Sequence, residues 1–298
     1  MEKIFENNIY QGDCLELIKG IPDGSVDCIV TDPPYLYLKH RLDRHFDEDT
    51  LFAEWKRVLK PNGMIAVFGR GESFHRWNVK LNQLGFPFKE EIIWNKIRPS
   101  SPVLPLVRVH ETISILGDGK INVCYVPYLE VRKYNDFHYI VDDIKRIKSG
   151  LNNPKEFDLL LKYAENKELH YLRPHRSKYG VTLSNKLSFR NNRSVDCLKS
   201  IINGFKERDI ITENFNDKNR VHPTQKSVRL IERLLALVSN PGEVVLDCFL
   251  GSGTTAVAAI NTGRKYIGFE LDAEYFATCQ RRIAEAQSAT APQPYNRL

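Results

Sequence analysis

The sequence predicts an α/β fold in which helices cover both faces of a doubly wound, mostly parallel sheet. Three observations lead to this prediction. Short apolar runs alternate with helix-spaced segments over residues 9–117 and again after residue 220. One run leads into Asp32-Pro33-Pro34-Tyr35, and a later one, over 243–249, contains Asp247. This later run leads into a glycine-rich loop, which is typical of a strand-to-helix turn at a ligand site.

Strands and helices alternate through the first part of the chain. The expected strands are 9–13, 26–31, 64–68, 91–96 and 112–116, and the expected helices are 14–19, 51–59 and 74–84. The helix over 51–59 places apolar residues on one face and ends before Lys60-Pro61-Asn62-Gly63, a helix-stopping turn. Residues 36–49 are polar and are expected to form a mobile loop beside the site.

The middle of the chain carries the positive charge. Residues 120–220 hold 20 Lys and Arg against 13 Asp and Glu, whereas the whole chain has a net charge of +6. Positive charge interleaved with Tyr and His fits contact with a phosphate backbone, although a solvated surface explains it equally well. This segment is either an inserted domain or a long arm.

Regular patterning returns in the last part of the chain. An amphipathic helix is expected over 227–238, a strand over 243–249, a helix over 256–261 and a strand over 265–270. The last strand ends in Glu270, and an acid there is suited to holding ribose hydroxyls. The strand over 243–249 is joined to the helix over 256–261 by the loop Gly251-Ser252-Gly253-Thr254-Thr255. Its glycines allow a ligand to approach the backbone closely.

Composition is that of an ordinary globular protein, with 42% hydrophobic and 27% charged residues. No apolar run reaches membrane-spanning length, so we expect no membrane association. The six cysteines are Cys14, Cys28, Cys124, Cys197, Cys248 and Cys279. Because they form no C-x-x-C pair, we expect reduced thiols, a cytoplasmic protein and no metal site.

The Asp32-Pro33-Pro34-Tyr35 stretch suits a planar ligand that carries an amino group. Prolines lack N–H groups, which leaves their carbonyls available to a ligand. The acid can accept a hydrogen bond from an amine, and the tyrosine ring offers a flat face to a base. A strand-ending turn without chemistry is the alternative, since Asp and Pro are common turn residues.

The glycine loop differs from one nucleotide-binding motif and matches another. It lacks the Lys that follows the last glycine of a P-loop, which argues against NTP hydrolysis. It matches G-x-G-x-x-A, so a dinucleotide site is an alternative. Only 28 residues follow Glu270, too few to complete such a sheet. The N-terminal strands must therefore complete it, which places Asp32 in the same sheet as the loop.

Together these motifs resemble the amino-methylating DNA methyltransferases that use S-adenosylmethionine. The order, with the Asp-Pro-Pro-Tyr motif first and the glycine motif last, is similar to their permuted beta group. Further matches are Gly12-Asp13, Leu59-Lys60-Pro61-Asn62-Gly63, Trp94-Asn95-Lys96, His110-Glu111 and His222-Pro223-Thr224-Gln225-Lys226. The family usually has Pro where this chain has Ser227, a change of little expected consequence because serine is a good helix cap. The resemblance implies a circularly permuted, seven-stranded, Rossmann-like methyltransferase sheet.

The resemblance also implies roles for individual residues. Asp32 and Pro33 would accept the two amino hydrogens of a flipped-out adenine, with Pro34 and Tyr35 completing the catalytic motif and Tyr35 stacking on the base. The implied cofactor-binding residues are Asp13, Thr224, Lys226, Asp247, Phe249, Gly251, Ser252, Gly253, Thr254, Thr255 and Glu270. Asp13 could equally cap a helix, Phe249 could be core, and Glu270 could be a surface charge. His110 and Glu111 have no chemical role that the sequence reveals, and they are expected to form a buried structural pair.

The implied activity is transfer of a methyl group to adenine N6 in double-stranded DNA. N4-cytosine methylation, methylation of an amine on RNA or protein, and a non-catalytic DNA-binding subunit are the alternatives. The expected divisions are a catalytic half (1–117), a target-recognition insertion (118–219), a cofactor-binding half (220–285) and a flexible tail (286–298). A homodimer and a cognate restriction enzyme are further candidate partners.

Overall fold

The computed structural model describes residues 3–35, 43–97, 106–132, 143, 200–201, 203–213 and 225–289. The chain divides into two compact units. The first comprises Met1–Val123 and Arg208–Arg297, and the second comprises Cys124–Glu207. The expected insertion, 118–219, is wider than this second unit. Asn122 belongs to the first unit, where its backbone N–H donates to the carbonyl of Leu237 at 2.8 Å.

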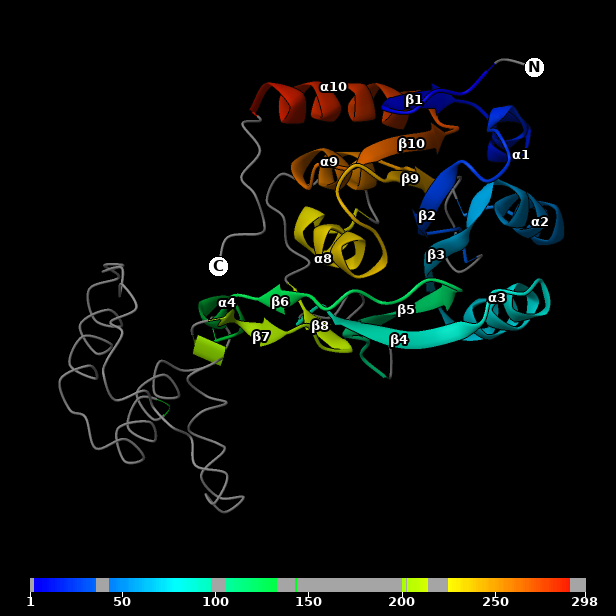
Figure 1. Ribbon diagram of the computed structural model, residues 1–298. Helices are drawn as coiled ribbons and strands as arrows, with labels where there is room; N and C mark the ends of the chain where they lie inside the picture. Colours follow the sequence, from blue (N-terminus) through cyan, green and yellow to red (C-terminus); the bar gives the residue numbers. More distant parts are fainter. Residues whose placement is uncertain are drawn as a thin grey trace. The chain divides into compact units, whose positions relative to one another are not determined.

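The first unit is built on an eight-stranded sheet with the order β1-β10-β9-β2-β3-β5-β4-β8 (Figure 1). Its strands are β1 (Asn8–Gln11), β2 (Val26–Thr31), β3 (Leu59–Gly69), β4 (Phe88–Asn95), β5 (His110–Gly117), β8 (Ile210–Thr212), β9 (Val244–Asp247) and β10 (Lys265–Glu270). β5 pairs antiparallel with both neighbours, and the other pairings are parallel. The predicted mostly parallel α/β sheet is therefore confirmed.

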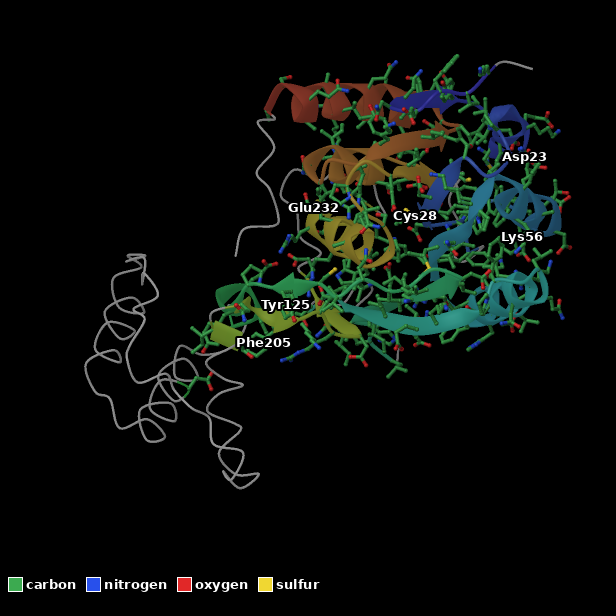
Figure 2. All side chains as sticks on the ribbon, in the orientation of Figure 1. Asp23, Cys28, Lys56, Tyr125, Phe205 and Glu232 are labelled. Atoms are coloured by element: carbon green, nitrogen blue, oxygen red, sulfur yellow. The ribbon has the colours of Figure 1, made fainter. Side chains whose placement is uncertain are left out.

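Helices cover the two faces of this sheet in two groups (Figure 1). The first group packs α1 (Cys14–Leu17) against α2 (Glu48–Val58), and α2 against α3 (Gly71–Gln83), with a short 3-10 turn at Ile18–Gly20. The second group packs α8 (Val228–Val238) and α10 (Ala273–Ala289) against α9 (Thr254–Asn261). Figure 2 shows Cys28 of β2 in the interior, whereas Asp23 and Lys56 lie at the outside.

Three details differ from the sequence prediction. The sheet has eight strands instead of seven, because β8 pairs with β4 at the edge; three residues are too few to show an alternating pattern. The expected tail starts at 286, but α10 continues to Ala289 through good helix formers. The turn at 60–63 lies inside β3 as a bulge, since Leu59 pairs with Val26 and Met64 pairs with Cys28.

A hydrophobic core holds the first helix group to the sheet. Its helix residues include Ile18, Leu51, Phe52, Trp55, Val58, Trp77 and Leu81, and its strand residues include Ile29, Ile65, Val67, Leu246 and Phe269. Burying each such side chain stabilises the fold by roughly 1.5–3 kcal/mol. On α8, Leu230, Ile231, Leu234 and Leu235 are also buried. The strands that end at or just before Asp32, Asp247 and Glu270 are thus fixed on both faces.

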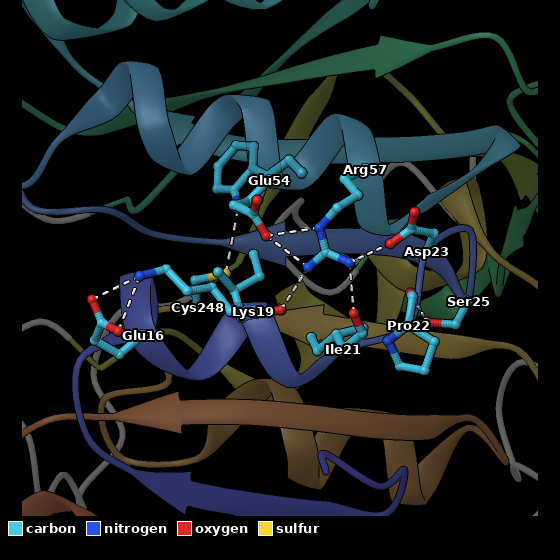
Figure 3. Close-up of polar contacts among 11 residues, drawn as sticks. Glu16, Lys19, Ile21, Pro22, Asp23, Ser25, Glu54, Arg57 and Cys248 are labelled. Atoms are coloured by element: carbon cyan, nitrogen blue, oxygen red, sulfur yellow. Dashed lines mark hydrogen bonds and ion pairs between the residues drawn. The ribbon is translucent and has the colours of Figure 1, made fainter. Parts of the chain in front are cut away.

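Arg57 of α2 anchors the turn that leads into β2 (Figure 3). Its guanidinium donates to Glu54 Oε2 through Nε at 2.9 Å and Nη2 at 2.6 Å. It also donates to the Asp23 carboxylate at 2.6 Å and to the carbonyls of Ile21 at 2.7 Å and Ile18 at 2.9 Å. All five N–H groups are used, so this arginine fixes where β2 begins.

The second unit has a small described core of its own. Strands β6 (Tyr125–Val126) and β7 (Phe205–Lys206) pair antiparallel, and α4 covers Tyr128–Arg132. The Tyr128 ring stacks on Phe205 with centroids 5.6 Å apart, and its hydroxyl donates to Asp143 at 2.8 Å.

In the described part of the chain, no helix is long and apolar enough to cross a membrane.

Candidate active site

The two motifs that stand more than two hundred residues apart in the sequence lie on neighbouring strands. β2 pairs directly with β9, with Cys28 opposite Val245 and Ile29 opposite Leu246. At their carboxyl ends, Thr31 Oγ1 donates to Asp247 Oδ1 at 2.7 Å. The expectation that both motifs share one sheet is confirmed. Chain order runs outward in opposite directions from β9 and β2, so the motifs sit at a switch point, where such sheets bind ligands.

Asp247 is a buried acid held entirely by neutral donors. Its Oδ1 accepts from Thr31 Oγ1 and from the backbone N–H of Phe249 at 3.0 Å, and its Oδ2 accepts from Thr255 Oγ1 at 2.6 Å. Burial raises the pKa of Asp247 to about 6, although these hydrogen bonds oppose the rise. A carboxylate desolvated in this way favours a cationic ligand.

The glycine loop requires its glycines. Gly251 and Gly253 have φ of 57° and 84°, values that side chains other than glycine rarely adopt. A Cβ on Gly253 would also stand 3.2 Å from Cα of Cys279 in α10. The same helix supports the loop through Arg282, whose Nη1 donates to the Ser252 carbonyl at 2.5 Å and the Ser252 hydroxyl at 2.9 Å. The loop is therefore held close to α10, with α9 beginning at Thr254.

Two further acids follow at the same edge of the sheet. Glu270 ends β10, and its carboxylate accepts from the backbone N–H groups of Gly251 and Asp272, both at 2.7 Å. Asp13 follows β1 and caps α1, accepting from the N–H of Leu15 at 2.9 Å. Burial raises the pKa of Glu270. Asp13, Glu270, Asp247 and Asp32 thus follow four adjacent strands.

Phe249 has two contacts that bear on its expected role. Its backbone N–H donates to Asp247, and its ring lies 5.1 Å from the ring of Phe46, centroid to centroid. The side chain is half-buried against the core. Thr255 donates to Asp247, while Thr254 accepts from Arg282 at 3.3 Å. Thr224 lies outside the described residues.

Asp32 accepts hydrogen bonds on both oxygens. Tyr35 donates its hydroxyl to Oδ1, and Lys226 donates its ammonium to Oδ2. The Tyr35 ring lies 5.9 Å from the ring of Trp77, centroid to centroid. Pro33 is buried and Pro34 is half-buried. Burial raises the pKa of Asp32, and attraction to Lys226 opposes this rise.

Lys226 lies at Asp32. The resemblance implied a place at the carboxylate end of the cofactor, but in the structure the ammonium lies between Asp32 and Glu111, 3.2 Å from Glu111 Oε2. A second lysine, Lys96, lies 3.1 Å from the other oxygen of Glu111. Although burial lowers the pKa of Lys226, the two carboxylates raise it above its usual value.

Glu111 and Lys96 are the residues whose role sequence reasoning missed. Glu111 is the second residue of β5, the antiparallel strand, so the start of this strand lies at the edge where the parallel strands end. His110 before it is exposed, so the expected buried pair of His110 and Glu111 is wrong. β4 ends beside the start of β5, with Trp94 opposite Glu111 and Lys96 one step beyond the strand. The sequence signal for both residues was their place in the family-like segments Trp94-Asn95-Lys96 and His110-Glu111. Their contact with each other and with Lys226 could not be read from spacing along the chain.

Comparison with known proteins agrees with this geometry. A family model described as DNA methylase matches residues 26–281. The DNA adenine methyltransferase YhdJ of Escherichia coli (strain K12) is 27% identical over 297 residues, covering 95% of this chain and 84% of the relative. The type II methyltransferase M.HinfI of Haemophilus influenzae is 25% identical over 304 residues, covering 94% of this chain and 69% of the relative.

Solved structures share the fold. The M1.HpyAVI–SAM complex superposes with a TM-score of 0.55 at 24% identity, over 93% of this chain and 98% of that one. The cytosine-N4-specific PvuII DNA methyltransferase gives the same TM-score at 16% identity, over 96% of this chain and 92% of that one. Since the family model spans most of the sequence, the chain belongs to the N6/N4 DNA methylase family.

Proposed function

We propose that this protein transfers a methyl group from S-adenosylmethionine to N6 of adenine in double-stranded DNA. The observation that carries the proposal is the junction of Asp32 and Asp247 on adjacent strand ends, linked through Thr31. It places an acceptor for an amino group beside an acid that favours a cation. The naming of YhdJ as a DNA adenine methyltransferase supports adenine as the base.

The residues at the sheet edge fit S-adenosylmethionine, which carries an ammonium, a carboxylate, a sulfonium and ribose hydroxyls. Asp247 would hold the ammonium, because its present donors are all neutral. The Phe249–Thr255 loop and Thr224 would hold the carboxylate end. Glu270, fixed by two backbone N–H groups, would accept from the ribose hydroxyls, and Asp13 from the adenine amino group.

The bound cofactor supplies an activated methyl group on its sulfonium. The chain's own contribution is to position the target amine. Asp32 and the carbonyl of Pro33 would each accept one amino hydrogen, which directs the nitrogen lone pair away from them and towards the methyl group. Tyr35 would stack on the extruded base, helping to replace the stacking lost from the duplex.

No covalent intermediate with the enzyme is needed for transfer to an amine. Three of the described cysteines agree with this, because burial raises the pKa of the Cys14, Cys28 and Cys279 thiols to about 12. Such thiols stay protonated at neutral pH and are poor nucleophiles. Direct transfer between the cofactor and the base is the mechanism these residues support.

The basic middle segment, including the second compact unit, is proposed to recognise the target sequence through phosphate and base contacts. A second copy of this chain and a cognate restriction enzyme are the other proposed partners. The proposed site of action is the cytoplasm, since none of the described cysteines is joined in a disulfide.

The test is to incubate the protein with methyl-labelled S-adenosylmethionine and unmethylated genomic DNA, then digest the DNA to nucleosides for mass spectrometry. We expect label in N6-methyladenine. Label in N4-methylcytosine would keep the mechanism and overturn the base, and the similarity to the PvuII enzyme makes this the second candidate. No label on DNA would refute the proposal.

An Asp32→Ala variant separates catalysis from binding alone. We expect turnover to be lost while affinity for S-adenosylmethionine is retained. The control is Asp118→Asn, which removes an exposed acid away from the proposed site and is expected to keep wild-type turnover. Equal turnover by Asp32→Ala and wild type would refute the assignment of Asp32 as the acceptor of the target amino group.

A further inference from the structure

Four charged side chains form a row that leads inward from the proposed acceptor. Asp32 is followed by Lys226, then Glu111, then Lys96, so that negative and positive charges alternate. Their side chains are 22%, 9%, 16% and 2% exposed, respectively. Asp32 is therefore the member that solvent, and a substrate, reaches most easily. The other three have little contact with water, and their charged groups form ion pairs with one another.

Lys226 is confined on several sides. Its ammonium donates to Asp32, lies 3.2 Å from Glu111 Oε2, and lies 4.9 Å from the centroid of the Phe68 ring. The two carboxylates and the aromatic face are the partners that an ammonium with three donors favours. Glu111 is held in turn by Lys96, at 3.1 Å from Oε1. Each link in the row depends on the next.

The role that Asp32 would play depends on its charge. A carboxylate accepts hydrogen bonds, whereas a protonated carboxyl turns one oxygen into a donor that would face the hydrogens of the target amine. Glu111 and Asp247 are the negative groups that interact with Asp32, and Tyr35 donates to it. Asp43 adds negative charge near Tyr35. Among the described residues, Lys226 donates its ammonium to Asp32 and, like the Tyr35 hydrogen bond, favours the ionised carboxylate.

We propose that Lys226, braced by Glu111 and Lys96, is a positioning residue that keeps Asp32 ionised and oriented as the acceptor of the target amino group. This inference rests on the proposed function and deepens it, because it moves Lys226 from the cofactor to the base. It also gives Glu111 and Lys96 a purpose. An isolated lysine beside a buried carboxylate would be free to rotate away, whereas Glu111 holds the ammonium in place from the other side.

Removing the positive charge should change how transfer depends on pH. In Lys226→Met, burial and Glu111 still raise the pKa of Asp32, while the hydrogen bond from Tyr35 opposes them without the help of Lys226. The acid limb of the single-turnover rate should therefore move upward by about 1–3 pH units. At a pH below the new pKa of Asp32, the rate should fall by about tenfold for each pH unit that separates the two, and it should recover towards pH 9. Lys226→Arg should retain most of the wild-type profile, because it preserves the charge.

Two further measurements separate this role from the alternatives. Affinity for S-adenosylmethionine should change less than about twofold in Lys226→Met; a tenfold loss (about 1.4 kcal/mol) with an unmoved acid limb would mean that Lys226 holds the cofactor and would overturn the proposal. Glu111→Gln removes a negative charge near Asp32, so its acid limb should stay or move downward. Equal loss of rate at every pH in both variants would indicate a merely structural role.

A test without turnover keeps the proposal independent of the assigned reaction. In wild-type protein with 13C-labelled aspartate carboxyls, the Asp32 resonance, identified by its absence in Asp32→Asn, should report an ionised group at pH 7. In Lys226→Met it should titrate at a higher pH than in wild type. A neutral Asp32 in wild type, or unchanged titration in the variant, would refute the positioning role. Failure of the proposed function would appear separately, as wild-type protein that does not methylate adenine.

Discussion

Asp247→Asn should make the protein more stable while weakening the binding of S-adenosylmethionine at its proposed cofactor site. The reason is the cost of holding a carboxylate in a buried position with neutral donors only. Burial raises the pKa of Asp247 from 3.8 to about 6. Each pKa unit corresponds to about 1.4 kcal/mol, so the ionised side chain destabilises the folded state by at most about 3 kcal/mol at pH 7.

Asparagine can keep the geometry of this side chain. Its oxygen can accept from Thr31 and from the N–H of Phe249, as Asp247 Oδ1 does. Its amide would face Thr255, whose hydroxyl can rotate from donor to acceptor. We therefore expect a net gain of roughly 1–3 kcal/mol, which for a domain of this size raises Tm by about 2–4 °C per kcal/mol.

The pH dependence gives the sharper test. The carboxyl has a raised pKa in the folded state, so the folded protein holds its proton more tightly than the unfolded chain. The penalty is absent below pH 3.8, grows as pH rises, and is complete above about pH 6. The gain in Tm for Asp247→Asn should therefore be full at pH 7.5 and shrink towards pH 4.

The assay is thermal unfolding of wild type, Asp247→Asn and the control Asp118→Asn, an exposed acid with the same charge change. Calorimetry with S-adenosylmethionine should show affinity reduced roughly 10- to 100-fold in Asp247→Asn, the worth of one hydrogen bond to a charged group. Lower stability of Asp247→Asn at every pH, or unchanged affinity, would refute the reasoning.

Three other predictions follow from the described residues. Gly253→Ala should lower stability by roughly 1–3 kcal/mol and weaken cofactor binding, measured by unfolding and calorimetry, because φ is 84° and the new Cβ would crowd Cys279; wild-type affinity would contradict this. Arg57→Met should lower the free energy of unfolding by about 2–4 kcal/mol in a urea titration, because it removes the donor of five hydrogen bonds. A change under about 0.5 kcal/mol would argue against Arg57 as the anchor of the turn before β2. Burial raises the pKa of Glu48, but hydrogen bonds, from Arg76 foremost, lower it to about 2. The stability of wild type over Glu48→Gln, roughly 1–2 kcal/mol after allowance for solvent screening, should be complete above pH 4.5 and vanish as pH falls to 2; a pH-independent difference would exclude this origin.

Local patterns determined much of the fold. The strand at Val26–Thr31 was predicted with the bounds it has, because an apolar run between a turn and Asp-Pro-Pro-Tyr leaves little choice. Helix α8 and strand β10 were equally readable from periodicity and from the residues that end them. The acids at strand ends followed from the same logic, since carboxyl ends of parallel strands share one edge.

Weak local signals left other elements unseen. β8 has three residues, and only its pairing with Ile93, Trp94 and Asn95 makes it a strand. Arg282 lies on α10, and its hold on the glycine loop depends on how that helix packs. Neither feature is marked in the sequence by a hydrophobic periodicity or by a motif.

The sequence by itself determined the sheet, the two motifs and the chemistry they suggest, because each depends on residues close together in the chain. Only the tertiary structure decided where Lys226 points. An antiparallel β5 brings Glu111 to the edge where β2 and β4 end, and there Lys226 lies between Glu111 and Asp32. A buried ammonium takes the position that pairs it with the most negative charge, and that position depends on packing between strands rather than on spacing along the chain.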